Sequence, residues 1–134
     1  MIIKRQIDIE DEIRQALAPY MRTYCRPLPA KPEIPCVLVQ QVGGSARNDL
    51  NSFEITLDAR GKTDAEALET IRNAVGLLQT IAKSQDVAIS YATVNTIAAW
   101  GSDPVRPDLA LATARLTVYT HPEAITMEEI YGNT

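Results

Sequence analysis

A strict alternation of apolar and polar residues over 52–60 (SFEITLDAR) constrains the fold of this chain more than any other feature. Successive side chains of a β-strand point to opposite faces of the sheet. Phe53, Ile55 and Leu57 therefore face one way, and the polar residues between them face the other. Such a strand belongs to an antiparallel sheet that has one face in the core and one face in water.

A helix follows this strand, and its start is marked by Thr63 and Glu66, which form a T-x-x-E capping box. An apolar stripe with spacings of three and four residues then runs along one side of the helix. The stripe consists of Leu68, Ile71, Val75, Leu78 and Ala82. We expect this stripe to pack in the core rather than to form a ligand groove.

An earlier helix is predicted to begin at Asp8, which can cap it, and acidic residues 10–12 suit the positive end of the helix dipole. Pro19 removes a backbone donor, so this helix kinks or ends near Ala18. The segment 25–35 (CRPLPAKPEIP) is too rich in proline for a helix or a central strand. We interpret it as an extended connector.

Three more segments have the composition of strands: residues 36–42, 87–100 and 109–121. One set of alternating residues on the last of these strands is small and apolar, so a helix can pack closely on it. This set consists of Ala110, Ala112, Ala114, Leu116 and Val118. The other set is mixed, and its apolar members suggest that something else covers part of the nominally wet face.

Gly43 and Gly44 raise the question of a phosphate-binding loop. Such a loop leads directly into a helix N-terminus, whose free N–H groups hold the anion. Residues 43–51 lead instead into the strand over 52–60, and no Gly-Lys-Ser/Thr sequence ends the loop. We therefore interpret residues 43–51 as a long polar hairpin loop.

Together these elements predict an α+β fold with the order α-ββ-α-ββ. We expect a four-stranded, mainly antiparallel sheet, built from two hairpins, with two helices packed on one face. Residues 1–122 form a single domain in this interpretation, and 123–134 form an acidic C-terminal tail. The tail is either frayed, which is the default for a terminus, or an arm that docks on a neighbouring subunit.

The sequence contains no constellation of residues that indicates an enzyme. His121 is the only histidine, and Cys25 and Cys36 fit two reduced thiols better than a disulfide. Glu54 and Asp58 share one face of a strand about 13 Å apart, too far to work on one bond. We expect them to pair with Arg60, Arg115 or a neighbouring subunit.

Composition excludes further classes of function. The formal net charge is −4 and the basic residues are scattered, which argues against sequence-specific binding of nucleic acid. No apolar run approaches the length of about 20 residues that a membrane span needs. The Cys and His residues are too few and too dispersed for a metal site, so we expect no cofactor and no metal.

The order of the segments resembles a known family. A helix precedes a strand bounded by proline (PCVLVQQVGG), a second strand continues into DARGKTDAEALETIRNAVGLL, and a final hairpin ends in LATARLTVYTHP. This pattern, over about residues 5–122, is similar to the tail terminator (tail completion) proteins of long-tailed phages and prophages. It also resembles the related minor tail proteins of head–tail joining.

The resemblance implies a structural virion protein rather than an enzyme. Its subunits would form a ring, usually a hexamer, that terminates the tail tube and joins it to the head. Expected partners are copies of the same chain, the tail tube protein and a head-completion or connector protein. DNA would pass through without specific binding. The protein would be made in the bacterial host cytoplasm and reside in the virion, at the interface of head and tail.

We expect loop contacts at the polar hairpin tips and a buried inter-subunit face on the wet side of the last strand. The candidate residues are Arg47, Asp49, Arg106 and Asp108 at the tips, and Leu109, Leu111 and Tyr119 on the sheet face. The alternative is a small-molecule-binding or regulatory α+β domain that acts as a homo-oligomer. Such a domain would need convergent polar groups between helix and sheet.

Overall fold

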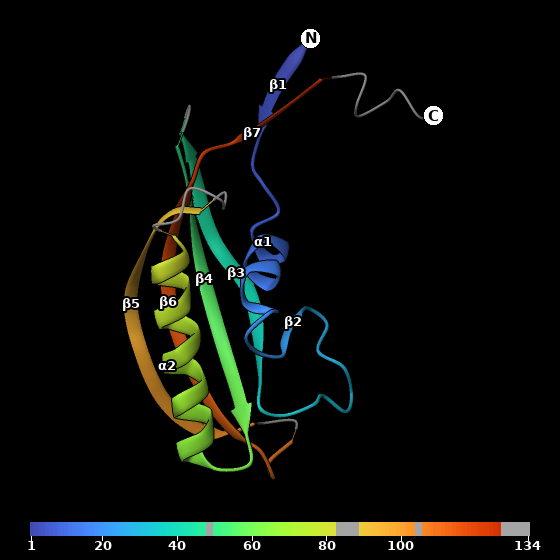
Figure 1. Cartoon of the computed structure of the whole chain (residues 1–134), viewed down its shortest axis with the longest axis vertical. Helices are drawn as coiled ribbons and strands as arrows, with labels where there is room; N and C mark the ends of the chain where they lie inside the picture. Colours follow the sequence, from blue (N-terminus) through green and yellow to red (C-terminus); the bar gives the residue numbers. More distant parts are fainter. Residues whose placement is uncertain (48–49, 83–88, 104–105, 127–134) are drawn as a thin grey trace.

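The fold, seen in a computed structural model, is α+β, and the structure describes residues 1–47, 50–82, 89–103 and 106–126. Within these residues two helices and seven strands follow one another, and Figure 1 shows their arrangement. The elements are β1 (Ile2–Arg5), α1 (Ile9–Leu17), β2 (Thr23–Cys25), β3 (Cys36–Arg47), β4 (Leu50–Gly61), α2 (Asp64–Ile81), β5 (Ile89–Ser102), β6 (Ala110–Thr120) and β7 (Glu123–Thr126).

The main sheet has five strands in the order β2-β3-β4-β6-β5. The four-stranded sheet that we predicted is therefore wrong. Strands β3, β4, β6 and β5 pair antiparallel, and β2 adds a short parallel pair in which Thr23 lies opposite Val37. The proline-rich segment after β2 carries the chain back to the same end of the sheet, which makes this pair parallel. Three residues are too few to show an alternation in the sequence.

The β3–β4 hairpin is longer than we predicted, and residues 43–47 and 50–51 belong to strands rather than to a loop. Strand β3 continues to Arg47 and pairs there with Leu50 of β4. The ladder absorbs an extra residue between Gln41 and Gly43, as a β-bulge does. Gly44 has φ 153°, and a Cβ atom there would lie 2.4 Å from the carbonyl oxygen of Ser52. Gly44 therefore serves the close approach of two strand backbones and is not part of a turn.

A second, two-stranded sheet consists of β1 and β7. The strands run antiparallel, with Ile3 opposite Ile125 and with an ion pair between Arg5 and Glu123. Residues 123–126 are therefore paired rather than frayed, and the chain has a strand before its first helix that we did not predict. The two partners lie at opposite ends of the sequence, and each is too short to carry a recognisable pattern.

Both helices begin where their capping residues predict. The Asp8 side chain accepts a hydrogen bond from the Asp11 amide, and α1 ends with Ala18 as its cap, directly before Pro19. In α2 the Thr63 hydroxyl accepts from the Glu66 amide at 3.2 Å. These caps satisfy amides that have no partner within the helix.

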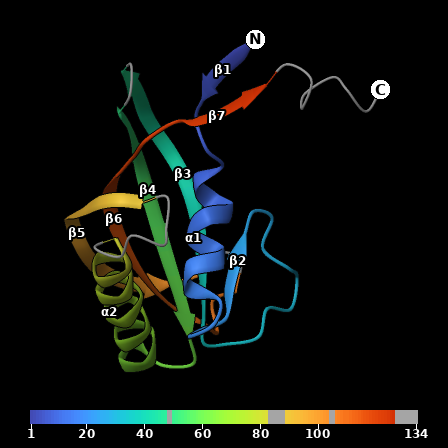
Figure 2. The same cartoon turned by 45° about the horizontal axis from the view of Figure 1, so that its top comes forward.

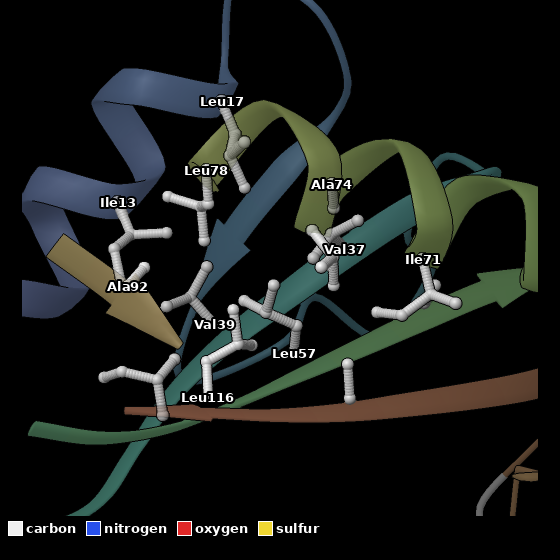
Figure 3. Close-up of a cluster of buried hydrophobic side chains, with 14 of the residues drawn as sticks. Ile13, Leu17, Val37, Val39, Leu57, Ile71, Ala74, Leu78, Ala92 and Leu116 are labelled. Carbon is white, nitrogen blue, oxygen red and sulfur yellow. The ribbon is translucent and has the colours of Figure 1, made fainter. Parts of the chain in front are cut away.

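The hydrophobic core lies between the two helices and one face of the main sheet (Figures 1 and 2). Figure 3 shows Ile13 and Leu17 of α1 and Ile71 and Leu78 of α2 directed toward the sheet. The small apolar set that we identified on the last strand is buried in this core and forms the inner face of β6. Alanine at alternate positions of β6 leaves room for α2 to lie close to the sheet.

Glu10 fastens α1 to the edge of the sheet. Its Oε2 accepts a hydrogen bond from the backbone amide of Gln41 at 3.1 Å, and it pairs with Arg26. Burial alone would raise the pKa of Glu10, but the hydrogen bonds from Arg26 and Gln41 outweigh it and lower that pKa. The ionised carboxylate therefore holds together α1, β3 and the segment after β2.

Two glycines offer a matched test of this backbone. Gly44→Ala should lower the free energy of unfolding by at least about 2 kcal/mol, since Ala is strained at that φ and its Cβ meets the Ser52 carbonyl. At Gly76, in α2, a new Cβ would meet no neighbouring atom within 4 Å. Gly76→Ala should therefore raise the free energy of unfolding by about 0.5–1 kcal/mol. Urea unfolding measures both variants; equal effects would contradict the close approach of Gly44 to the Ser52 carbonyl.

Glu10→Gln tests the link between α1 and β3. A carboxyl whose pKa is lower in the folded state adds stability above its unfolded pKa, about 4.3 for Glu. That stability is lost as the pH falls through the lowered, folded pKa. The variant should therefore be less stable than the wild type by about 1 kcal/mol at pH 7, and the difference should disappear in acid.

Urea unfolding from pH 7 down to about pH 3 measures this difference. Glu69→Gln, on the exposed side of α2, is the control and should change the stability little at any pH. A stability difference between Glu10→Gln and the wild type that stays constant over this range would contradict the proposed role of the charge.

Candidate interaction surface on the outer face of the sheet

The face of the main sheet opposite the two helices, here called the outer face, carries most of the polar side chains of the strands. Phe53, Ile55 and Leu57 of β4 point into the core, so the residues between them point outward. The cross-strand register then places residues of β3, β6 and β5 beside them on the same face.

Asp58 lies at the centre of one cross-strand group. One carboxylate oxygen accepts from Gln40 of β3 at 2.9 Å, and the other accepts from the Thr113 hydroxyl of β6 at 2.8 Å. The three side chains bridge three neighbouring strands and are each only partly exposed. These hydrogen bonds restrict the rotamers of the three side chains, so this part of the surface is preorganised.

A second group crosses the sheet farther along β4. The Thr117 hydroxyl donates to the Glu54 carboxylate at 3.1 Å and accepts from the Asn95 amide nitrogen at 2.8 Å. Within the described chain Glu54 and Asp58 thus bond to neutral side chains and not to Arg60 or Arg115, and pairing with a neighbouring subunit stays a prediction. Arg115 is exposed between the two groups and has no hydrogen-bond or ion-pair partner among the described residues.

One end of the outer face, at the tip of the β3–β4 hairpin, is more apolar. We call it the hairpin-end patch, and it consists of Ser45, Leu50, Ser52, Tyr91 and Tyr119. The Tyr91 and Tyr119 rings lie with their centroids 6.1 Å apart, and Leu50 is 47% exposed. A shallow hollow of about 250 Å³ lies among Ser45, Leu50, Ser52 and Tyr119.

The opposite end of the outer face is covered by the chain itself. Arg60 donates from Nε to Asp103 at 2.6 Å, and both side chains are almost fully buried. The proline-rich connector lies beside this pair, and the two sides enclose a hollow of about 330 Å³. The hollow is lined by Leu28, Pro29, Ala30, Pro32, Arg60, Asp103 and Arg106.

The predicted interface residues fall at these two separate ends. Tyr119 is in the hairpin-end patch, and Arg47 ends β3 nearby, whereas Asp49 lies outside the described residues. Leu111, eight residues from Tyr119 along β6, is about 26 Å away at the rise of a strand. Leu111 and Tyr119 therefore do not form one continuous contact.

Three other predicted residues lie at the covered end of the sheet. Arg106 and Asp108 pair with each other, with Nη2 and Oδ2 3.1 Å apart. Leu109, which we assigned to a subunit interface, is only 5% exposed. Other residues of the same chain already cover it.

The thiols and the histidine are dispersed. Cys25 and Cys36 are both free, and burial raises the pKa of each thiol. His121 is exposed beyond the end of β6. In the described part of the chain no three His, Cys, Asp or Glu residues are close enough to hold a metal ion.

None of the described helices is long and apolar enough to cross a membrane. Neither a scan against protein-family models nor a search of curated proteins found a match for this sequence.

Two aspartates that both pair with arginine give a matched test of the covered end. Asp103→Ala should lower the free energy of unfolding by about 3–5 kcal/mol, because it leaves the buried Arg60 charge without its partner. Asp108→Ala should have a far smaller effect, since its pair with Arg106 is open to solvent. Urea unfolding compares the two, and similar losses would contradict a buried ion pair.

Proposed function

We propose that this chain is a structural virion protein of a long-tailed phage or prophage. Its copies form a ring that terminates the tail tube and joins it to the head. The sequence resemblance set out above suggests this function. The structural observation that supports it best is the preorganised outer face of the sheet, which neither helix covers.

The chemistry of the outer face suits contact with another protein. It combines hydrogen-bonded polar groups with Tyr91, which is 56% exposed, and the half-buried Tyr119. Tyrosine is enriched at the centres of protein interfaces, where a large, rigid ring contributes contact area at little entropic cost. Lysine and glutamate, which are depleted from interface centres, are absent from the hairpin-end patch.

A ring also requires two different surfaces on each subunit. In a ring each subunit contacts its two neighbours through different surfaces, and this heterologous contact gives a closed ring when the rotation between subunits closes. The outer face supplies one such surface, and the β1–β7 ribbon is a second, separate surface (Figure 1). The formal net charge of −4 suits a ring through which DNA passes, since strong phosphate binding needs clustered basic residues.

The alternative, a small-molecule-binding or regulatory homo-oligomer, is favoured by the hollow beside Arg60. Its volume of about 330 Å³ is at the lower end of the range for ligand sites. Its lining combines apolar and charged groups, as ligand sites do. A thermal-shift screen with metabolites distinguishes the two functions. The ring subunit should give no stabilisation by small molecules, whereas the alternative should give stabilisation that Arg106→Ala abolishes.

Light scattering after size-exclusion chromatography tests the ring directly. We expect a closed oligomer that appears as a ring in negative-stain images and that binds purified tail tubes. Tyr91→Asp should weaken assembly about tenfold or more, whereas Tyr20→Asp, which changes a tyrosine 66% exposed on the helix side, should not. A strict monomer at high concentration that binds no tail tube would overturn the proposal.

A further inference from the structure

The β1–β7 ribbon projects from the body of the protein (Figures 1 and 2). Its two strands pair with each other, and neither packs closely on another described helix or strand. Ile2 is 70% exposed, whereas Ile3 and Ile125, which lie opposite each other, are half-buried. The ribbon thus holds apolar residues in solvent, and no third strand of the described chain pairs with either of its edges.

An isolated two-stranded ribbon is marginally stable in water, and open edges readily pair with or dock on another chain. The ribbon spans four residue pairs, and one ion pair, Arg5 with Glu123, links its strands near the body. Neither of its strands contains a proline that would block its edge. These properties are those of an arm whose stabilising contacts come from a second molecule.

The ribbon has too little connecting chain to cover its own subunit's hairpin-end patch. Only His121 and Pro122 separate β6 from β7, and residues 6–8 separate β1 from α1. Tyr119 is the second-last residue of β6, and Pro122 restricts the backbone of the connection that follows. Both views show the ribbon directed away from the tip of the β3–β4 hairpin (Figures 1 and 2).

The hairpin-end patch has the matching properties. Leu50 and Tyr91 are exposed, and a hollow of about 250 Å³ among Ser45, Leu50, Ser52 and Tyr119 can accept an aliphatic side chain. The adjacent edge of β3 pairs with no described strand beyond Val39, where β2 ends, and Glu10 and Arg26 bond its backbone only at Gln41. Beyond it Val42 is 60% exposed, and the residues at 43–46 are small and uncharged.

We infer that the β1–β7 ribbon of one copy docks on the hairpin-end patch of the next, with Ile2 in its hollow. This inference rests on the proposed ring and specifies its contact. The two surfaces differ and lie on one chain, so each copy offers a ribbon to one neighbour and a patch to the other. Such a contact is heterologous and continues from copy to copy until the ring closes.

Cross-linking between isotopically distinct chains tests the docking. Ile2→Cys is made in unlabelled protein and Leu50→Cys in nitrogen-15-labelled protein; the two are mixed under assembling conditions and oxidised. Mass spectrometry then identifies disulfides that join an unlabelled peptide to a labelled one, which form only between chains. Tyr20→Cys replaces Ile2→Cys in the control, because Tyr20 is equally exposed but lies outside the ribbon.

We expect the mixed disulfide from Ile2→Cys to exceed that from the Tyr20→Cys control about tenfold or more. Ile2→Asp should weaken assembly by a similar factor while leaving the circular dichroism spectrum unchanged, since Ile2 is outside the core. A ring that forms normally with Ile2→Asp, or that gives equal cross-linking in both mixtures, overturns the docking and leaves the proposed function standing. A wild-type protein that never assembles overturns both.

Discussion

The close packing of α2 on the inner face of β6 is the contact on which the rest of this structure depends. Ala112 and Ala114 are fully buried there, and α2 contributes Ala67 and Ala74 from its own side. Small side chains on both elements let helix and sheet approach closely, so the core is complete on one face of the sheet. The outer face is not needed for this core, so away from the buried Arg60–Asp103 pair it can carry polar, preorganised groups.

The parts of the fold that the sequence predicts are those with a sustained period. The alternation over 52–60 and the stripe that follows Thr63 correspond to β4 and α2. Strands β1, β2 and β7 have only three or four residues each, too few for any period, and β1 and β7 are defined by partners at opposite ends of the chain. Gly44 was misinterpreted because a glycine that allows close backbone approach looks the same in sequence as one in a turn.

The candidate surface was only partly predictable. Tyr119 was identified because apolar residues on a wet face stand out within the alternation of β6. Tyr91 was missed because irregular pairing in β5, between Ile89 and Tyr91, hides which face each residue occupies. Leu109 was assigned to an interface because sequence patterns do not reveal that loops of the same chain cover the far end of the sheet.

The central claim is that the β1–β7 ribbon and the outer face of the sheet are surfaces where copies of this chain meet. Hydrogen exchange of the backbone amides, compared between dilute monomer and assembled protein, tests this claim most directly. We expect the amides at 2–5, 42–46 and 123–126 to exchange more slowly on assembly, while those of α2 stay unchanged. Equal exchange of the ribbon amides in both states would contradict it.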